Sequence, residues 1–292
     1  MDDITDATGA PARLTIGAAQ AGWRLDKAAG LLWPDMGLRG RRRRIEAGGL
    51  TVNGRVMPPA TKVRAGDELV AVAVASPEAT VAAADIPVVA DGSDYAALVK
   101  PGGLHSASLG PGGGPSLEDL LPTLFPGRAA ILLSRLDELT SGLVPVAFSQ
   151  EAAATYRRLE DAGQVEKTYL AVVHGLVDAP FTTARALDVD DRATTRVLAR
   201  ETTDPLRVTR VRPEDTRGGC TLVACRIHKG ARHQIRAHLA AAGHPIVGDP
   251  RYGRGEGERL YLHCAGLLSP VLSVTNQPSW TLDAAVALAR ED

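Results

Sequence analysis

The sequence predicts an α+β protein built from two folded parts. Its 292 residues are enough for two domains that each bury a core. The first part shows two helical patterns followed by short strands. The second mixes helices and strands without regular alternation, which argues against a doubly wound parallel sheet. With 45% hydrophobic and 23% charged residues, the composition is that of a folded globular chain.

The composition excludes several other classes of protein. No apolar run approaches the roughly 20 residues of a membrane span, and the acidic, polar start of the chain is unlike a signal peptide. Three cysteines in a chain of this length exclude a disulfide scaffold and favour a reducing compartment. We therefore expect a cytoplasmic protein.

Domain boundaries are expected where the composition changes. The prediction is a disordered N-terminus over residues 1–20, a small module over 21–75, a linker over 76–86 and a larger domain over 87–292. The linker is assigned because its sequence, SPEATVAAADI, is rich in small and polar residues.

Local patterns place the elements of the small module. Helical spacing of apolar residues predicts one helix at Leu25–Leu32, before Pro34, and a second at Leu38–Ala47, before two glycines. Short strands are predicted at Leu50–Val52, from Val56 onward and at Val63–Val70. The pair Asn53-Gly54 is typical of a type I′ turn between antiparallel strands.

The larger domain is expected to contain several strands with helices between them. Strands are predicted at Tyr95–Val99, Ala130–Leu133, Leu143–Phe148, Thr168–His174 and Thr221–Ile227. Helices are predicted at Gln150–Ala162 and Arg232–Ala242, each followed by a glycine, and a third begins after Ser116.

Charge is distributed unevenly along the chain. The net charge is −1, yet residues 1–76 carry a surplus of three positive charges and residues 77–292 a surplus of four negative ones. Five arginines cluster on the second predicted helix: Arg39, Arg41, Arg42, Arg43 and Arg44. Such a cluster binds phosphates and releases their counterions, which favours a nucleic-acid partner. The alternative interpretation is a charged helix face that is merely solvated.

Several segments of the small module together resemble an S4-type RNA-binding domain. They are RLDK at residues 24–27, the arginine-rich helix, VNGR at 52–55 and VRAGD at 63–67. The resemblance implies that the basic face of the second helix binds structured RNA. RNA contacts are therefore expected from Arg39, Arg41, Arg42, Arg43 and Arg44.

Four segments of the larger domain form a second pattern. They are LVKPGGLH at residues 98–105, SRLDELTSGL at 134–143, KTYLAVVHG at 167–175 and GARHQIRAHL at 230–239. In this order they resemble the RluA-type pseudouridine synthase family, and with the small module the resemblance covers about residues 20–270. The strongest match is Arg-Leu-Asp followed by Thr-Ser-Gly-Leu in the second segment.

This resemblance implies a mixed, largely antiparallel sheet and an isomerase that converts uridine in RNA to pseudouridine. It makes Asp137 the nucleophile, Arg236 its ionic partner and Tyr169 the residue that stacks on uracil. Tyr169 would also help remove the C5 proton, as phenolate or through water. RNA contacts are expected from Arg135, Arg232, His233 and Gln234. Because Arg232 and Arg236 are four residues apart on a predicted helix, they are expected to share one face.

The implied chemistry needs a carboxylate and neither cofactor nor metal. Asp137 would cleave the C1′–N1 bond, by attack at C1′ or through a glycal, and the released uracil would rejoin through C5. The target base must first leave its stack. A metal site is not expected, because His233 and His238 project about 140° apart around a helix. No cysteine or carboxylate completes a ligand set near them.

The expected partner is RNA, and a monomer is expected. Large-subunit rRNA is favoured by analogy with S4-bearing family members, and tRNA is the alternative. Departures from the family pattern occur at Val99, Ser134 and Ala231. These departures motivate a second hypothesis, in which the fold is a catalytically inactive RNA-binding or ribosome assembly factor. The retained aspartate, tyrosine and arginine favour the enzyme.

Overall fold

The computed structural model describes residues 12–34, 36–46, 48–72, 82–108, 115–190, 194–253 and 259–290. Predicted disorder at residues 1–11, linker residues 76–81 and the side chains of Arg39 and Arg43 lie outside this description. The chain divides into two units, residues 1–81 with 107–116 and residues 82–106 with 117–292. The first division, between residues 81 and 82, falls inside the predicted linker.

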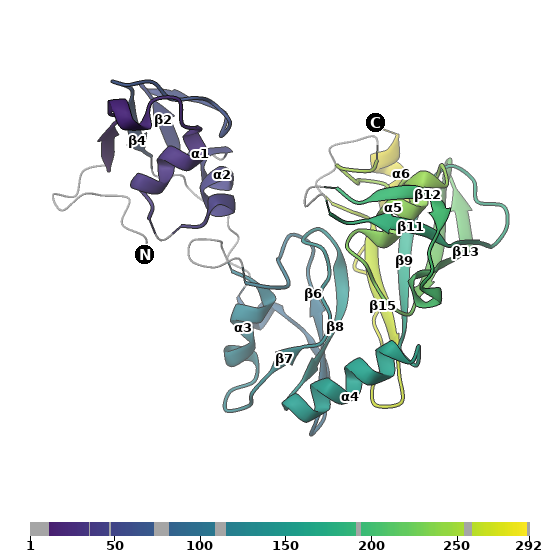
Figure 1. Ribbon diagram of the computed structural model, residues 1–292. Coiled ribbons are helices and arrows are strands. Elements are labelled where there is room, and N and C mark those ends of the chain that lie inside the picture. The colour runs from purple at the N-terminus through teal and green to yellow at the C-terminus, as the bar shows by residue number, and fades with distance from the viewer. Residues whose placement is uncertain are drawn as a thin grey trace. The chain divides into compact units, whose positions relative to one another are not determined.

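Unit 1 combines short helices with a four-stranded antiparallel sheet (Figure 1). In chain order its elements are β1 (Arg13–Thr15), η1 (Ala18–Gln20), α1 (Leu25–Ala28), η2 (Ala29–Leu31), α2 (Leu38–Glu46), β2 (Leu50–Val52), β3 (Arg55–Val56) and β4 (Glu68–Ala71). The strand order is β1-β4-β2-β3. The core is apolar, with Leu25, Ile45, Leu50 and Leu69 fully buried. Burial of these side chains is what stabilises so small a unit.

The start of unit 1 corrects one prediction and its hairpin confirms another. Residues 12–20, expected to be disordered, form β1 and η1, and Ile16 is 2% exposed. A three-residue strand is too short for an alternating pattern to reveal it. The predicted type I′ turn is present, since Asn53 and Gly54 have φ of 50° and 78°.

Unit 2 is built on a large sheet with four α-helices in its described part. Its helices are η3 (Ala83–Asp85), α3 (Leu117–Leu124), α4 (Gln150–Asp161), η4 (Pro205–Arg207), α5 (Gln234–Ala241) and α6 (Leu282–Ala289). Its strands are β5 (Val88–Asp91), β6 (Tyr95–Lys100), β7 (Ile131–Leu132), β8 (Ser141–Ala147), β9 (Glu166–His174), β10 (Phe181–Thr183), β11 (Arg185–Asp188), β12 (Arg196–Glu201), β13 (Thr209–Arg217), β14 (Cys220–Ile227), β15 (Leu262–Leu268) and β16 (Ser273–Thr275).

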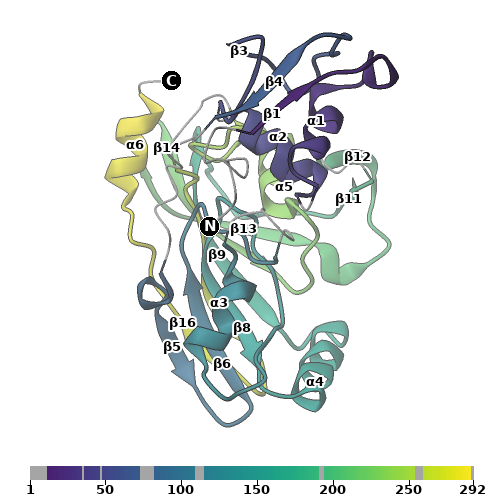
Figure 2. The ribbon, with the colours of Figure 1, turned by 90° about the vertical axis from the view of Figure 1, so that its left-hand side faces the viewer.

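The sheet of unit 2 confirms the predicted mixed, largely antiparallel class. Its strand order is β10-β13-β14-β9-β15-β8-β6-β5, with β16 beside β15 and β7 beside β8. Within the described residues every pair is antiparallel except β8 with β15. Figure 2 shows α3 in front of the β6–β8 end of the sheet and α6 beside β14 at the other. The pair β11–β12 forms a separate ribbon.

Helix α5 begins two residues later than the sequence predicts. His233, with φ of 54° and ψ of 19°, adopts a left-handed conformation just before Gln234. Few residues other than glycine do so, and the sequence pattern gives no sign of it. Arg232 therefore lies outside the helix, and the prediction that it shares a helical face with Arg236 is wrong.

Neither a membrane-spanning helix nor a metal-binding cluster is present in the described ranges of the two units. No helix there is long and apolar enough to cross a membrane. In the same residues, no group of three or more His, Cys, Asp or Glu side chains is arranged to hold a metal ion.

Candidate active site

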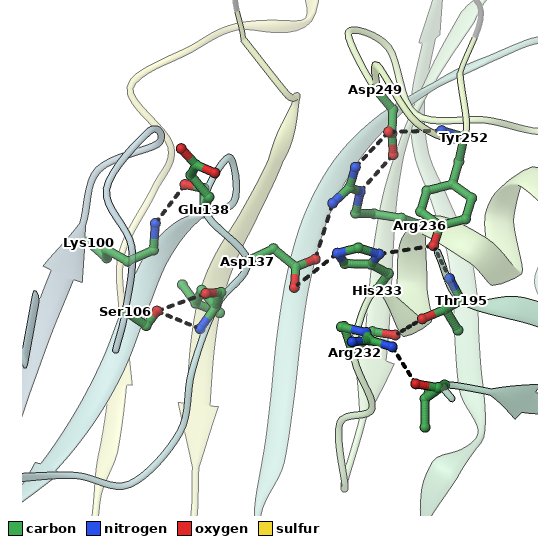
Figure 3. Close-up of polar contacts among 12 residues, drawn as sticks. Lys100, Ser106, Asp137, Glu138, Thr195, Arg232, His233, Arg236, Asp249 and Tyr252 are labelled. Carbon is green, nitrogen blue, oxygen red and sulfur yellow. Dashed lines mark hydrogen bonds and ion pairs between the residues drawn. The ribbon is translucent and has the colours of Figure 1, made fainter. Parts of the chain in front are cut away.

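Asp137 lies in the loop between β7 and β8, as predicted. Buried Ser106 holds the preceding residue from two sides: its Oγ donates to the Leu136 carbonyl (2.8 Å) and accepts from the Leu136 N–H (2.9 Å; Figure 3). Beyond Asp137, the Thr140 N–H donates to the Asp137 carbonyl at 3.1 Å. Because these backbone groups are all hydrogen-bonded, the main chain is fixed on both sides of Asp137.

Lys100 fixes the same loop from the end of β6. Its ammonium is buried and donates to the carbonyls of Pro101 (2.8 Å), Leu104 (2.7 Å) and Glu138 (3.0 Å). Burial lowers the pKa of Lys100 to about 7, while the charges of Asp137 and Glu138 oppose this shift. Only the ammonium form supplies three N–H donors for three carbonyls. Lys100 was part of a recognised segment but had no predicted role.

The predicted pairing of Arg236 with Asp137 is present. Arg236 Nη1 lies 3.3 Å from Asp137 Oδ2. The same guanidinium contacts Asp249 through two hydrogen bonds, Nε to Oδ2 at 2.8 Å and Nη2 to Oδ1 at 2.7 Å. The side chains of Arg236 and Asp249 are 5% and 1% exposed, whereas that of Asp137 is 23% exposed. Asp249 therefore anchors the arginine, and Asp137 presents a carboxylate to solvent.

Asp249 is a site residue that the sequence did not reveal. Burial alone would raise its pKa, but the hydrogen bonds and charge of Arg236 lower the pKa below its usual value. The N–H groups of Arg251 and Tyr252 also donate to Asp249 Oδ1, at 2.9 and 3.1 Å. Asp249 ends the stretch GHPIVGD at residues 243–249, which continues the fourth segment of the family pattern, but this pattern assigned the acid no role.

Tyr169 lies in β9 and is 8% exposed. Its register partners are Cys225 in β14 and Cys264 in β15, so the three side chains share one face of the sheet. Burial raises the pKa of the Tyr169 hydroxyl well above its usual value, and Cys264 and the charge of Asp137 add to this. The hydroxyl is therefore neutral at physiological pH, which disfavours the phenolate alternative.

Comparison with known proteins decides the family. The family model described as RNA pseudouridylate synthase matches residues 94–241, just over half of the chain. The matched segment contains Asp137, Tyr169 and Arg236. The chain belongs to this family. The predicted family and enzyme class are thereby confirmed.

Individual pseudouridine synthases are similar over most of the chain. Ribosomal large subunit pseudouridine synthase D of Xanthomonas campestris pv. campestris is 31% identical over 241 residues, or 80% of this chain and 72% of the relative. Ribosomal large subunit pseudouridine synthase C of Salmonella typhimurium is 31% identical over 281 residues, or 87% of each chain. The structure of human RNA pseudouridylate synthase domain containing 1 matches with a TM-score of 0.55 at 23% identity, over 72% of this chain and 97% of that one. The last match shows a shared fold.

One residue predicted to bind RNA is instead part of this synthase's interior. Gln234 is 2% exposed. Its amide donates to the Arg207 carbonyl (3.2 Å) and Thr209 Oγ1 (3.1 Å) and accepts from the Ala231 N–H (2.9 Å). Buried polar groups need such partners, so Gln234 secures the turn before α5 and the predicted RNA contact is wrong.

The other predicted RNA contacts of unit 2 differ in exposure. Arg135 is exposed beside the Asp137 loop. Arg232 is half-buried and donates from Nη2 to the Val189 carbonyl. His233 faces Asp137 rather than open solvent (Figure 3). Of the three, Arg135 is thus the one that is classed as exposed and therefore accessible to RNA.

The glycine of the Thr-Ser-Gly-Leu stretch is required where β8 meets β15. Gly142 lies opposite Cys264 in the parallel pair and has φ of +116°. A Cβ at Gly142 would stand 2.4 Å from both the N and O of Cys264, which no side chain can do. Beside it, Ser141 Oγ lies 2.9 Å from His263 Nδ1, and His263 Nε2 lies 3.2 Å from Asn276 Oδ1. The end of the Asp137 loop is thereby tied to β15 and to the residue that follows β16.

The arginine-rich helix of unit 1 is partly engaged within its own module. Asp26 is 1% exposed, and its Oδ2 accepts from Arg24 Nη2 (2.9 Å) and Arg42 Nε (2.6 Å). Both arginines remain about half exposed, at 48% and 44%. Arg42 therefore joins α2 to α1 while part of its guanidinium still faces solvent.

Two further arginines of the run also have structural contacts. Arg41 Nε donates to the Met36 carbonyl at 2.8 Å. Its guanidinium passes so close to Gly30 that a Cβ there would lie 2.1 Å from Nη1. The guanidinium of Arg44 lies 4.9 Å from the Trp33 ring centroid, within cation–π range. Arg41, Arg42 and Arg44 therefore do not form only a solvated charged face, because each also contacts another part of unit 1.

Proposed function

We propose that this pseudouridine synthase acts on uridines of large-subunit ribosomal RNA, with Asp137 as its nucleophile. The observation that supports Asp137 most is its partly exposed carboxylate, which faces a buried guanidinium anchored by Asp249. The substrate is supported by the relatives, two of which are ribosomal large subunit pseudouridine synthases. The proposed location is the cytoplasm, and tRNA is the alternative substrate.

The proposed reaction conserves all atoms of the nucleotide. Asp137 attacks C1′ of a flipped-out uridine, and the C1′–N1 bonding electrons leave with the uracil. The glycal route is the alternative for this step. The uracil turns, and C5 bonds to C1′ as the bond between Asp137 and C1′ breaks and its electrons return to the carboxylate. The C5 proton then leaves and N1 gains a proton. Arg236 orients the carboxylate, and neutral Tyr169 offers the ring on which uracil stacks, with proton removal through water.

The test uses in-vitro transcribed large-subunit rRNA and tRNA labelled with tritium at C5 of uridine. We expect wild type to release tritium from the rRNA and Asp137→Asn to release none while binding the RNA normally. Equal release by both proteins would overturn the role of Asp137. Release from tRNA alone would replace the proposed substrate. No release from either RNA by wild type would support the inactive RNA-binding factor.

We further propose that unit 1 is an S4-type RNA-binding module. Its two helices, its β2–β3 hairpin and the arginines on α2 support this proposal. Because Arg41 and Arg42 also hold the module together, a combined substitution of the run would confuse binding with folding. Arg44→Gln separates the two effects better, because the contact of Arg44 within the module is with one face of the Trp33 ring.

Filter binding of the rRNA transcript at increasing salt measures this contribution. Loss of one phosphate contact lowers the slope of log K against log salt by about one. We expect that change for Arg44→Gln with an unaltered melting temperature. For Arg42→Gln we expect both a lower slope and a lower melting temperature. An unchanged slope in both variants would show that these arginines serve only the fold.

A further inference from the structure

His233 stands at one oxygen of the catalytic carboxylate and Arg236 at the other. His233 Nε2 lies 3.8 Å from Asp137 Oδ1, and Arg236 Nη1 lies 3.3 Å from Oδ2 (Figure 3). The His233 side chain is 10% exposed, so little water reaches it. The two carboxylate oxygens of Asp137 therefore have different neighbours, a histidine ring at Oδ1 and a guanidinium at Oδ2.

The backbone of His233 is held in a conformation that a histidine rarely adopts. Among the described residues, only Asn53 and His233 combine a positive φ with a side chain. Asn53 belongs to a hairpin turn, where this conformation is expected. At His233, which lies in no such turn, the left-handed geometry is unfavourable because it brings Cβ close to the backbone. Such backbone strain is retained where the surrounding structure needs a side chain in one particular place. Here it places the His233 ring beside the carboxylate of Asp137.

A hydrogen-bond chain favours one tautomer of His233. The Thr195 N–H donates to Tyr252 Oη at 2.7 Å, and this oxygen lies 2.9 Å from His233 Nδ1. Because Tyr252 Oη accepts from Thr195, donation of its own proton to Nδ1 uses both the acceptor and the donor function of the hydroxyl. In that arrangement Nδ1 accepts, and Nε2 carries the proton on the side of Asp137.

We propose that His233 is a positioning residue for the reaction, whose neutral ring, protonated at Nε2 and oriented by Tyr252, directs Asp137 Oδ1 toward C1′. At 3.8 Å the Nε2–Oδ1 separation exceeds a hydrogen bond, so Oδ1 is held less tightly than Oδ2 and is the oxygen free to bond carbon. This inference rests on the proposed role of Asp137. It assigns His233 to the carboxylate rather than to an RNA contact.

The charges around His233 support the neutral form. Burial lowers the pKa of His233, the charge of Asp137 opposes this, and nearby arginines reinforce it. The groups that face the ring are Asp137, Arg232, Arg236, Arg251 and Tyr252. A protonated ring would place a cation against Oδ1 and weaken the nucleophile. The rate should therefore fall as the pH drops through a His233 pKa that lies below the ordinary histidine value.

The first test replaces His233 by asparagine, which tolerates the left-handed backbone. The matched control is His244→Asn, whose ring lies against Phe181 and the His174 carbonyl instead. Single-turnover tritium release from the rRNA transcript and filter binding are measured from pH 5 to 8. For His233→Asn we expect a rate about 10- to 100-fold lower and an unchanged dissociation constant for the RNA. The fall of the rate at low pH, which we call the acid limb of the pH profile, should also be lost. The control should keep the wild-type rate and limb.

The second test, Tyr252→Phe, removes only the hydroxyl. Because the hydroxyl donates to neutral His233, its loss should raise the His233 pKa and move the acid limb to higher pH, with recovery of rate at pH 8. A limb that stays in place would overturn the proposed orientation. A wild-type rate with weakened RNA binding in His233→Asn would overturn the inference and restore an RNA contact. Activity retained by Asp137→Asn would instead overturn the proposed function, so the two failures are distinguishable.

Discussion

The chain contains Arg-Leu-Asp twice, and the two aspartates have opposite surroundings. Asp26, in α1, is buried between Arg24 and Arg42, whose side chains are about half exposed. Asp137, in a loop, is partly exposed and faces buried Arg236. In unit 1 the acid is hidden and its cations are accessible, whereas in unit 2 the cation is hidden and the acid is accessible. The same tripeptide thus places a buried carboxylate in one unit and, in the other, an accessible carboxylate that we propose to be the nucleophile.

The largest expected effect tests whether buried Arg236 makes this difference. Arg236→Gln should lower the single-turnover rate by more than about 100-fold, because Asp137 loses its orienting cation. It should also destabilise unit 2 by about 3–5 kcal/mol, since Asp249 stays buried without its cation. Urea denaturation and tritium release measure the two effects. The matched variant Arg24→Gln, at an exposed arginine, should lower stability far less, because solvent screens its charge. Equal losses of stability in Arg236→Gln and Arg24→Gln would show that burial of the arginine does not distinguish the two units.

The second prediction concerns the buried acid of unit 1. Asp26→Asn should destabilise unit 1 by about 2 kcal/mol, less than a fully buried pair because both arginines are half exposed. Faster hydrogen exchange in α1 and α2, with unchanged exchange in β9 and β14, is the expected readout. Unaltered exchange in α2 would show that Asp26 does not join the two helices.

The third prediction separates positioning of the Asp137 loop from general stability. Ser106→Ala removes both hydrogen bonds to Leu136, so we expect a rate about 10-fold lower and a stability loss of about 1–2 kcal/mol. The control is Ser149→Ala, which removes the cap of α4 and costs about 1 kcal/mol away from the site. If both variants lose rate equally, the loss reflects stability and not position.

The smallest expected effect is a pH dependence of unit 1. Burial alone would raise the pKa of Asp26, but the hydrogen bonds and charges of Arg24 and Arg42 lower it below 3.8. A lowered carboxyl pKa stabilises the fold above the unfolded value near 3.8, and this stability is lost as the pH falls through the folded pKa. Between about pH 5 and 2, wild type should approach the stability of Asp26→Asn. Parallel pH profiles for the two proteins would contradict this.

Elements with strong local signals were predictable from the sequence. The arginine-rich helix, expected at Leu38–Ala47, is observed at Leu38–Glu46, and the strand expected at Thr168–His174 is observed at Glu166–His174. Apolar spacing and flanking glycines sufficed in these cases because the elements bury one clear face. The loop position of Asp137 followed from the strands predicted on either side of it, whereas its pairing with Arg236 followed from the family pattern.

The features that could not be predicted from the sequence depend on contacts between residues that lie far apart in the chain. The start of α5 is set by the backbone of His233, whose conformation is maintained by its tertiary surroundings. Asp249 gains its role only when the fold brings it to Arg236. The arginine run was expected to be free for RNA, but Arg42 contacts Asp26, 16 residues earlier in the chain. Such pairings leave no periodic trace in a sequence.

The parallel pairing of β8 with β15 also determines when the active site can form during synthesis. Ser141 contacts His263, 122 residues further along the chain. The contact of the end of the Asp137 loop with β15 can therefore form only after β15 has left the ribosome, whereas the contacts of this loop with Lys100 and Ser106 involve residues made earlier. Contacts of such long sequence separation form slowly and late in folding. A nascent chain that contains Asp137, Tyr169 and Arg236 therefore still lacks the pairing of β8 with β15 until residues Leu262–Leu268 have been synthesised.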